Sequence, residues 1–201
     1  TLGGSVSTGA NQLTISGSGD VDKTGSTFTI NSGGELVKDG TGTLTISGTQ
    51  SVAGGRLYTH KDGTLNVPNL YVGYDNVADI VQTGGTIKIG QHYLMVGTTG
   101  GLGRYTISGG LMDLTGATGI GRLYVGWHGD GEINQSGGTI KAKVFDSGDV
   151  GDGTYNLSGG TLIVLGEGHL GYASGYKSDF FQSGGSASFE KLVLGGTGSG
   201  G

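Results

Sequence analysis

The residues of this sequence that could support chemistry are few, and one group of them is regularly spaced. Asp146, Asp149 and Asp152 lie three residues apart in the segment DSGDVGDG, and carboxylate oxygens are ligands that Ca²⁺ prefers. Aspartates flanked by glycine are also ordinary turn residues, and the segment does not match the nonapeptide calcium repeat. We therefore name the three aspartates as the candidate calcium ligands and expect them to lie in a loop.

Histidines and nucleophiles provide no second candidate. The four histidines occupy different places relative to the repeats described below, so they do not stack into a metal-binding column: His60, His92, His128 and His169. The chain has no cysteine, which removes disulfides, thiolate catalysis and cysteine-based zinc sites. No Ser, His and Asp residues have the spacing of a nucleophilic triad. The sequence therefore predicts no catalytic residues and no cofactor.

Aromatic residues form the one suggestive surface feature. Five of them fall at equivalent places in successive repeats, either at the outward position of a strand or just after a glycine: Tyr71, Tyr74, Tyr124, Trp127 and Tyr172. Stacked repeats would gather these rings into a band along one side, and exposed rings are anchors for sugars or for another protein. The alternative interpretation is that they only cover the backbone of neighbouring loops.

The composition excludes several classes of protein. Glycine supplies 48 of the 201 residues and proline only one, with no Gly-X-Y period, which excludes collagen. A net charge of −5 with 33% hydrophobic residues argues against both a disordered chain and a basic nucleic-acid-binding surface. No apolar run approaches the length of a membrane span. A glycine-rich chain that still holds alternating β-branched residues predicts many short strands.

A repeat organises the chain. Six segments share a glycine followed by an alternating strand, as in GTLTI, with a looser seventh; they begin at Gly42, Gly63, Gly85, Gly110, Gly138, Gly160 and Gly185. The spacings are 21, 22, 25, 28, 22 and 25 residues, a period typical of one coil of a β-solenoid. In the strand after each of these glycines, apolar residues such as Leu65, Ile87 and Met112 alternate with polar ones, so we expect the apolar set to face inward. Each repeat also holds a second strand of the form LYVG and a third strand that ends in Ser/Thr-Gly-Gly.

Glycine pairs close the third strand in five repeats: Gly84 and Gly85, Gly109 and Gly110, Gly137 and Gly138, Gly159 and Gly160, and Gly184 and Gly185. We expect these pairs to supply positive φ angles and to let successive corners stack without β-carbon clashes. Just before the corner, Gln82, Gln135 and Gln182 alternate with Ile107 and Leu157. This column is therefore predicted to face the interior, where stacked amides or corner backbone groups would satisfy the glutamines.

These patterns predict an all-β fold, a parallel β-helix with three short strands in each coil of about 21–28 residues. We expect a single domain over residues 1–201. It divides into irregular N-terminal coils over 1–40, regular repeats over 41–195 and a glycine-rich tail over 196–201.

The units YTISGG, INQSGGTI and YNLSGGTLIV, alternating with LYVG, resemble repeats of large bacterial surface proteins. The resemblance is to autotransporter-type passengers and their associated glycine-rich β-strand repeats, and it covers about residues 41–195. It implies a right-handed parallel β-helix, a location outside the cell or on the bacterial surface, and a role in adhesion, surface coating or matrix. It brings no catalytic residues.

Three functions agree with this pattern. The first, which we expect, is a non-enzymatic structural protein that associates head to tail with itself into a fibre, matrix or surface layer, because neither end shows an obvious cap. The second is an adhesin segment that presents the aromatic band to extracellular glycans. The third is a polysaccharide lyase or hydrolase that depends on Asp146 or Asp149. Nucleic acid and a membrane span are not expected.

Overall fold

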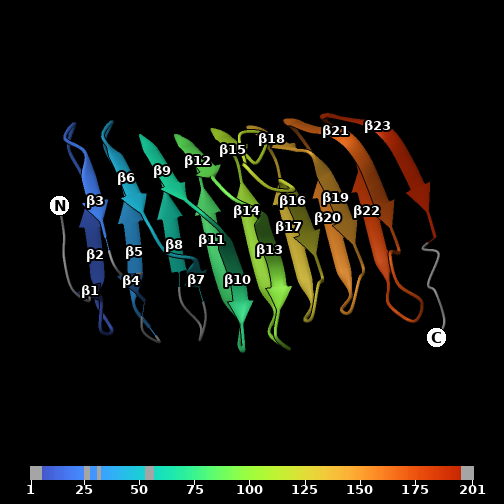
Figure 1. Ribbon diagram of the computed structural model, residues 1–201, viewed down its shortest axis with the longest axis horizontal. Helices are drawn as coiled ribbons and strands as arrows, with labels where there is room; N and C mark the ends of the chain where they lie inside the picture. The colour runs from blue at the N-terminus through green and yellow to red at the C-terminus, as the bar shows by residue number, and fades with distance from the viewer. Residues whose placement is uncertain (1–5, 25–27, 31–32, 53–56, 196–201) are drawn as a thin grey trace.

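Parallel strands stacked into a β-solenoid make up this protein, as a computed structural model shows (Figure 1). The structure describes residues 6–24, 28–30, 33–52 and 57–195. In this part the chain has strands and turns but no helix, and hence none that could cross a membrane. The solenoid has about 7 turns of about 23 residues each, which confirms the predicted fold class. The predicted tail over 196–201 lies outside the described residues.

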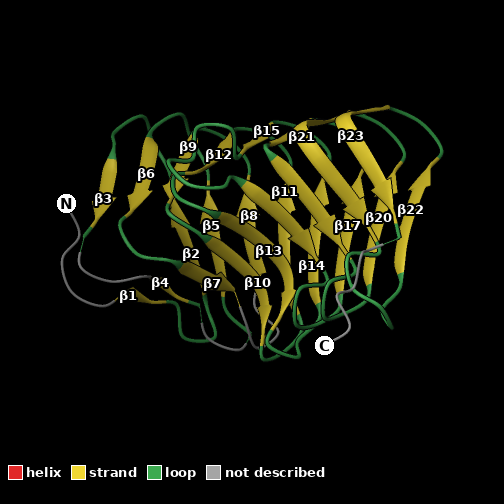
Figure 2. Cartoon of the chain, turned by 45° about the vertical axis from the view of Figure 1, so that its right-hand side comes forward, coloured by secondary structure: helices red, strands yellow, loops and turns green. Residues whose placement is uncertain are grey.

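Three stacks of parallel strands, which we call faces 1, 2 and 3, surround the core (Figure 2). Face 1 contains the strands that precede the glycine pairs: β2 (Gln12–Ile15), β5 (Glu35–Lys38), β8 (Leu57–His60), β11 (Ala78–Gln82), β14 (Gly103–Ile107), β17 (Gly131–Gln135), β20 (Gly153–Leu157) and β22 (Ser178–Gln182).

Faces 2 and 3 complete each coil. Face 2 contains β3 (Val21–Lys23), β6 (Thr43–Ile46), β9 (Thr64–Val67), β12 (Thr86–Ile89), β15 (Leu111–Asp113), β18 (Thr139–Ala142) and the first parts of β21 (Thr161–Leu170) and β23 (Ser186–Leu194). Face 3 contains β7 (Gln50–Val52), β10 (Leu70–Tyr74), β13 (Tyr93–Thr98), β16 (Arg122–Val125), β19 (Val144–Ser147) and the second parts of β21 and β23.

Strands β21 and β23 run through the corner between faces 2 and 3, so these two faces form one 13-stranded sheet. A separate pair is formed by β1 (Val6–Ser7) and β4 (Phe28–Thr29). In the first forty residues, β2, β3 and β5 already pair in register with the coils that follow. Regular stacking therefore begins before residue 41.

The core consists of columns of equivalent side chains. Because side chains alternate along a strand and the strands stack in register, one residue type recurs on the inside at each level. On face 2, Leu65, Ile87 and Met112 lie in one such column, and each is at most 1% exposed. The predicted inward set is therefore confirmed.

A column of polar side chains follows the inside of the corner between faces 1 and 2. Lys38, His60 and Gln82 are stacked in register there. Lys38 Nζ donates to the carbonyls of Gly40 and Asp62, at 2.7 and 3.3 Å. Gln82 Nε2 donates to those of Gly84 and Gly85, at 3.1 and 3.3 Å. The prediction that corner backbone groups satisfy the buried glutamines is thus confirmed for Gln82.

The glycine pairs shape the same corner in two ways. The second glycine of every pair has a positive φ, between 59° and 79°, as predicted, whereas the first does not. A β-carbon on the first glycine would lie only 2.2–2.4 Å from a carbonyl oxygen of the preceding coil. The first position is therefore restricted by close approach of the backbone, and the second also by its conformation.

Alanine substitutions separate these two restrictions. Gly110 and Gly100 have nearly the same φ, +79° and +77°, but a β-carbon at Gly110 would lie 2.4 Å from two carbonyl oxygens, whereas nothing lies within 4 Å at Gly100. We expect Gly100→Ala to lower the free energy of unfolding by about 1–2 kcal/mol through backbone strain. Gly110→Ala should cost about 1–3 kcal/mol more through overlap. Urea denaturation measures both, and equal losses would contradict the stacking restriction.

The buried His60 should make the folded chain less stable at acidic pH. Its ring is fully buried beside the Tyr58 hydroxyl, 3.0 Å from Nδ1, and burial lowers the pKa of His60 to about 4. The unfolded chain takes up the proton first, near pH 6.5, so the stability contribution is complete above that pH. It is lost as the pH falls toward 4, by roughly 3 kcal/mol in total.

His60→Gln tests this expectation, because glutamine occupies the equivalent position in a neighbouring coil and does not titrate. Unfolding free energies measured between pH 7 and pH 4 should depend less on pH in His60→Gln than in the wild type. The exposed His128 serves as the control, since His128→Gln should keep the wild-type pH dependence. If the unfolding free energy of His60→Gln depends on pH as strongly as that of the wild type, another group causes the pH dependence.

Candidate functional site

The outer surface of face 3 gathers most of the side chains that the sequence suggested. A column of outward positions passes through Tyr71, Met95, Tyr124, Asp146 and His169, each paired in register with the next. Their neighbours along each strand point into the core, so these side chains point away from it. Met95, Tyr124 and Asp146 are nevertheless buried. Large side chains in adjacent coils and corners cover the middle of this column.

Asp146 lies at the centre of an ionic cluster. Its side chain is 0% exposed, with Arg122 Nε 3.2 Å from Oδ2 and His169 Nδ1 2.7 Å from Oδ1. We assign the proton to His169 Nδ1, which then donates to the carboxylate. Burial raises the pKa of Asp146, against the opposing effects of Arg122 and His169. The carboxylate is thus held between one cation and one polarised ring.

The cluster extends in both directions along the solenoid. Arg122 Nη1 donates to the Tyr124 hydroxyl at 2.8 Å, and its guanidinium carbon lies 5.3 Å from the Tyr124 ring centroid. On the other side, His169 Nε2 lies 3.6 Å from Glu167 Oε2, and Lys191 Nζ lies 2.5 Å from Glu167 Oε1. Charged and polar side chains in contact therefore link four successive coils through β16, β19, β21 and β23.

This arrangement is suited to holding coils together. An Asp–His pair acts in catalysis when it orients the histidine toward a nucleophile or a substrate proton. In the described part of the chain, the partner beyond Asp146 that lies within ion-pair distance of His169 is Glu167, a carboxylate. The geometry thus indicates an electrostatic clamp on the outside of face 3.

The three candidate calcium ligands are used differently. Asp146 is buried in the cluster, and Asp149 is partly buried in the corner that follows. Asp152 is exposed, and its Oδ1 accepts the Lys177 backbone N–H at 2.9 Å. Among residues 6–24, 28–30, 33–52 and 57–195, no three or more His, Cys, Asp or Glu side chains are grouped so that they could hold a metal ion.

The expectation that all three aspartates lie in a loop was wrong for Asp146, which belongs to strand β19. The physical reason is that Phe145 fills the inward position taken by Leu123 in the coil before, and so continues the core column. Aligning VFDSG with RLYVG would have identified the strand, because both end in the glycine that begins the corner.

The predicted aromatic band forms only in part. The ring centroids of Tyr93, Tyr124 and Trp127 are 5.9 and 6.0 Å apart in sequence order. Tyr124 is only 8% exposed, so the expectation of an exposed ring there was wrong: it lies beneath its aromatic neighbours and Arg122. The sequence interpretation also missed Tyr93, although it precedes LMVG and shares the outward parity of Met95.

The remaining aromatic candidates lie nearer the surface. Tyr71 and Trp127 are partly buried, and Trp127 packs edge-on against His128 with centroids 4.1 Å apart. Tyr74 is the last residue of β10, and Tyr172 lies two residues after the end of β21. Each is 39% exposed. They are separate exposed rings rather than parts of one flat platform.

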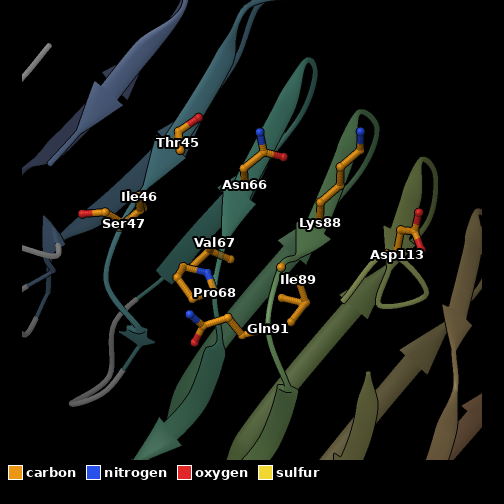
Figure 3. A pocket seen from close by; sticks show the side chains of 12 residues that line it. Thr45, Ile46, Ser47, Asn66, Val67, Pro68, Lys88, Ile89, Gln91 and Asp113 are labelled. Carbon is orange, nitrogen blue, oxygen red and sulfur yellow. The ribbon is translucent and has the colours of Figure 1, made fainter. Parts of the chain in front are cut away.

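A groove of about 380 Å³ crosses the outside of face 2, beside its corner with face 3 (Figure 3). Polar side chains from four successive strands lie along it: Thr45, Asn66, Lys88 and Asp113. Gly116, from the extra segment of the longest repeat, lines one end. Insertions in a repeat often mark a binding face. The groove presents hydroxyl, amide, ammonium and carboxylate groups along the solenoid axis.

If the cluster around Asp146 clamps the coils together, Arg122 and Arg104 should contribute unequally to the free energy of unfolding. Arg122→Met removes the cation from a fully buried carboxylate, which should cost about 3 kcal/mol. Arg104 on face 1 is the control, because it lies 3.5–3.7 Å from Glu132 and Asp79 with its side chain 42% exposed. Arg104→Met should therefore change the unfolding free energy by less than about 1 kcal/mol.

Adding Asp146→Leu to Arg122→Met should restore most of the lost stability, because no unpaired charge is then buried. Urea denaturation of the three variants measures these differences. Similar losses for Arg122→Met and Arg104→Met, or no recovery in the double variant, would contradict a buried clamp.

Comparison with known proteins yields no relative. No family model matches the chain, and no curated protein or solved structure is significantly similar to it. The geometry of the described residues therefore has to support any functional conclusion.

Proposed function

We propose that this chain is a non-enzymatic, extracellular structural protein whose solenoid associates end to end with further copies into a fibre, matrix or surface layer. Exposed apolar side chains in the last described coil carry the proposal. Leu192 and Leu194 in its last coil are 45% and 72% exposed, whereas their equivalents Leu94 and Val96 are 0% exposed. The last described coil thus exposes to solvent apolar positions that the inner coils bury.

Strand edges at both ends support the same proposal. At one end, β22 and β23 each have a hydrogen-bonded neighbour on one side, as do β2 and β3 at the other, within the described residues (Figure 1). The N-terminal edge adds the partly buried Leu13, Ile15 and Val21. Unpaired edges with apolar side chains promote strand addition. A contact between two different ends of identical subunits is heterologous, and it generates open filaments when it does not close into a ring.

Charge and chemistry also agree with a structural role. Only 13% of the residues are charged, so little repulsion opposes association of copies. Asp146, one of the two carboxylates named for a lyase or hydrolase, is 0% exposed and paired with Arg122 and His169. The extracellular location is supported by the likeness of the repeats to those of bacterial surface proteins.

A second candidate function is glycan binding by an adhesin segment. The exposed Tyr74 and Tyr172 rings and the polar groove on face 2 favour it. Aromatic rings and a ladder of hydrogen-bonding groups are the features that sugar recognition uses.

The two functions differ in what the purified chain does alone. Sedimentation velocity and electron microscopy over a wide concentration range should show the wild type growing into longer rods. Leu194→Asp should weaken this association at least about tenfold, because a charge is then placed in an apolar contact. Val150→Asp is the control, since Val150 is 38% exposed but lies in a corner between coils. Solitary rods at every concentration would refute self-association and leave glycan binding as the alternative.

A further inference from the structure

Buried glutamines in this solenoid pair with tyrosines of the following coil. The Tyr105 hydroxyl donates to Gln82 Oε1, and the Tyr155 hydroxyl donates to Gln135 Oε1 at 2.5 Å. All four side chains are at most 1% exposed. In the sequence, each glutamine directly precedes the corner Ser or Thr, and its tyrosine lies three residues before the next corner.

The following coil also supplies an acceptor. Gln82 Nε2 donates to the carbonyl of Leu111 at 3.1 Å, and Gln135 Nε2 donates to that of Thr161 at 3.1 Å. A buried amide is costly unless both its oxygen and its nitrogen are bonded. Each glutamine is therefore fully satisfied only when the next coil is in place and carries a tyrosine.

Gln182 is the third glutamine of this column, and it lies in the last described coil. It is exposed, and its Nε2 donates to the carbonyl of Gly185 in its own corner at 3.2 Å. Within the described residues, no group donates to its Oε1. Two residues before Gln182 in β22, Phe180 lies in the column of the tyrosines. Its ring stacks on that of Tyr155, with centroids 5.2 Å apart and an interplanar angle of 21°. Phe180 is only partly buried, and among the described residues the other ring in contact with it, Phe189, meets it edge-on with centroids 6.3 Å apart.

We propose that this end is a docking surface for a β-coil of a second polypeptide that carries a tyrosine three residues before a Ser/Thr-Gly-Gly corner. The proposal rests on the end-to-end association above and names its partner. The strand of that coil pairs with β22, its tyrosine ring stacks on Phe180, and its hydroxyl donates to Gln182 Oε1. One of its carbonyls accepts from Gln182 Nε2, and its apolar residues cover Leu192 and Leu194.

The first strand of face 1 in this chain, β2, fits the surface less well. In register, β2 has Leu13 in the tyrosine column and Ile15 in the glutamine column. A second copy docked in this register places Leu13 over Phe180, and Gln182 Oε1 then has no donor. We therefore expect the N-terminal coil of a copy to bind roughly tenfold more weakly than a tyrosine-bearing coil.

Two peptides test the partner. The first is residues 151–162 of this chain, GDGTYNLSGGTL, which contains the strand that satisfies Gln135. The second differs only by Tyr155→Phe. Titrated into the isotope-labelled full chain, the tyrosine peptide should shift the NMR signals of β22 and bind about tenfold tighter than the phenylalanine peptide. Equal affinities, no binding, or shifts confined to other strands would overturn the proposal.

Gln182→Leu is the matched variant, because Leu157 occupies the same column one coil earlier. It should bind both peptides with equal affinity. A tyrosine preference that persists in Gln182→Leu would also overturn the proposal.

Leu13→Tyr extends the test to whole chains. It should strengthen self-association about tenfold in the wild-type background, whereas Leu13→Phe should not. Failure of self-association is distinguishable from failure of the docking surface. A wild type that stays monomeric but binds the tyrosine peptide through Gln182 refutes only self-association. A wild type that associates but shows no tyrosine preference refutes only the partner.

Discussion

Each coil of this solenoid satisfies its backbone through the coils on either side, and the rest of the molecule depends on that constraint. Parallel strands about 4.8 Å apart exchange N–H···O=C bonds between equivalent residues. The ladders continue into the corners, where Ser108 and Ser136 donate from their backbone N–H to the carbonyls of Gln82 and Ile107, each at 2.9 Å. A corner can approach its neighbour this closely only if it has no β-carbon, and this explains the glycine pairs.

The polar interior follows from the same constraint. Corner carbonyls of Gly40, Gly84 and Gly85 point inward and accept from Lys38 and Gln82. A buried lysine or glutamine in an apolar core would otherwise suggest a binding site, but here these side chains complete the hydrogen bonding of the backbone. In the last described coil, no group among the described residues donates to the Gln182 side-chain oxygen. The selectivity that we propose for that coil rests on this difference from the interior.

Much of the fold could be predicted from residues close together in the chain. Alternation placed Leu65 and Ile87 inside, and the Ser/Thr-Gly-Gly corners marked the end of face 1, because both depend on strand geometry and local turn conformation. The candidate site was predicted less well. Asp146 was assigned to a loop and Tyr124 to an exposed position, because strand pairing and coverage depend on neighbours in other coils.

The period, the inward and outward sets and the glycine corners follow from local sequence, since these are properties of segments of a few residues. Which outward side chains meet depends on how the coils stack. Arg122, Asp146 and His169 are separated by 24 and 23 residues along the chain, yet lie within hydrogen-bonding or ion-pair distance on adjacent strands. Repeats that vary between 21 and 28 residues absorb the difference in their corners. The register that stacking selects therefore determines these contacts, and spacing in the sequence does not.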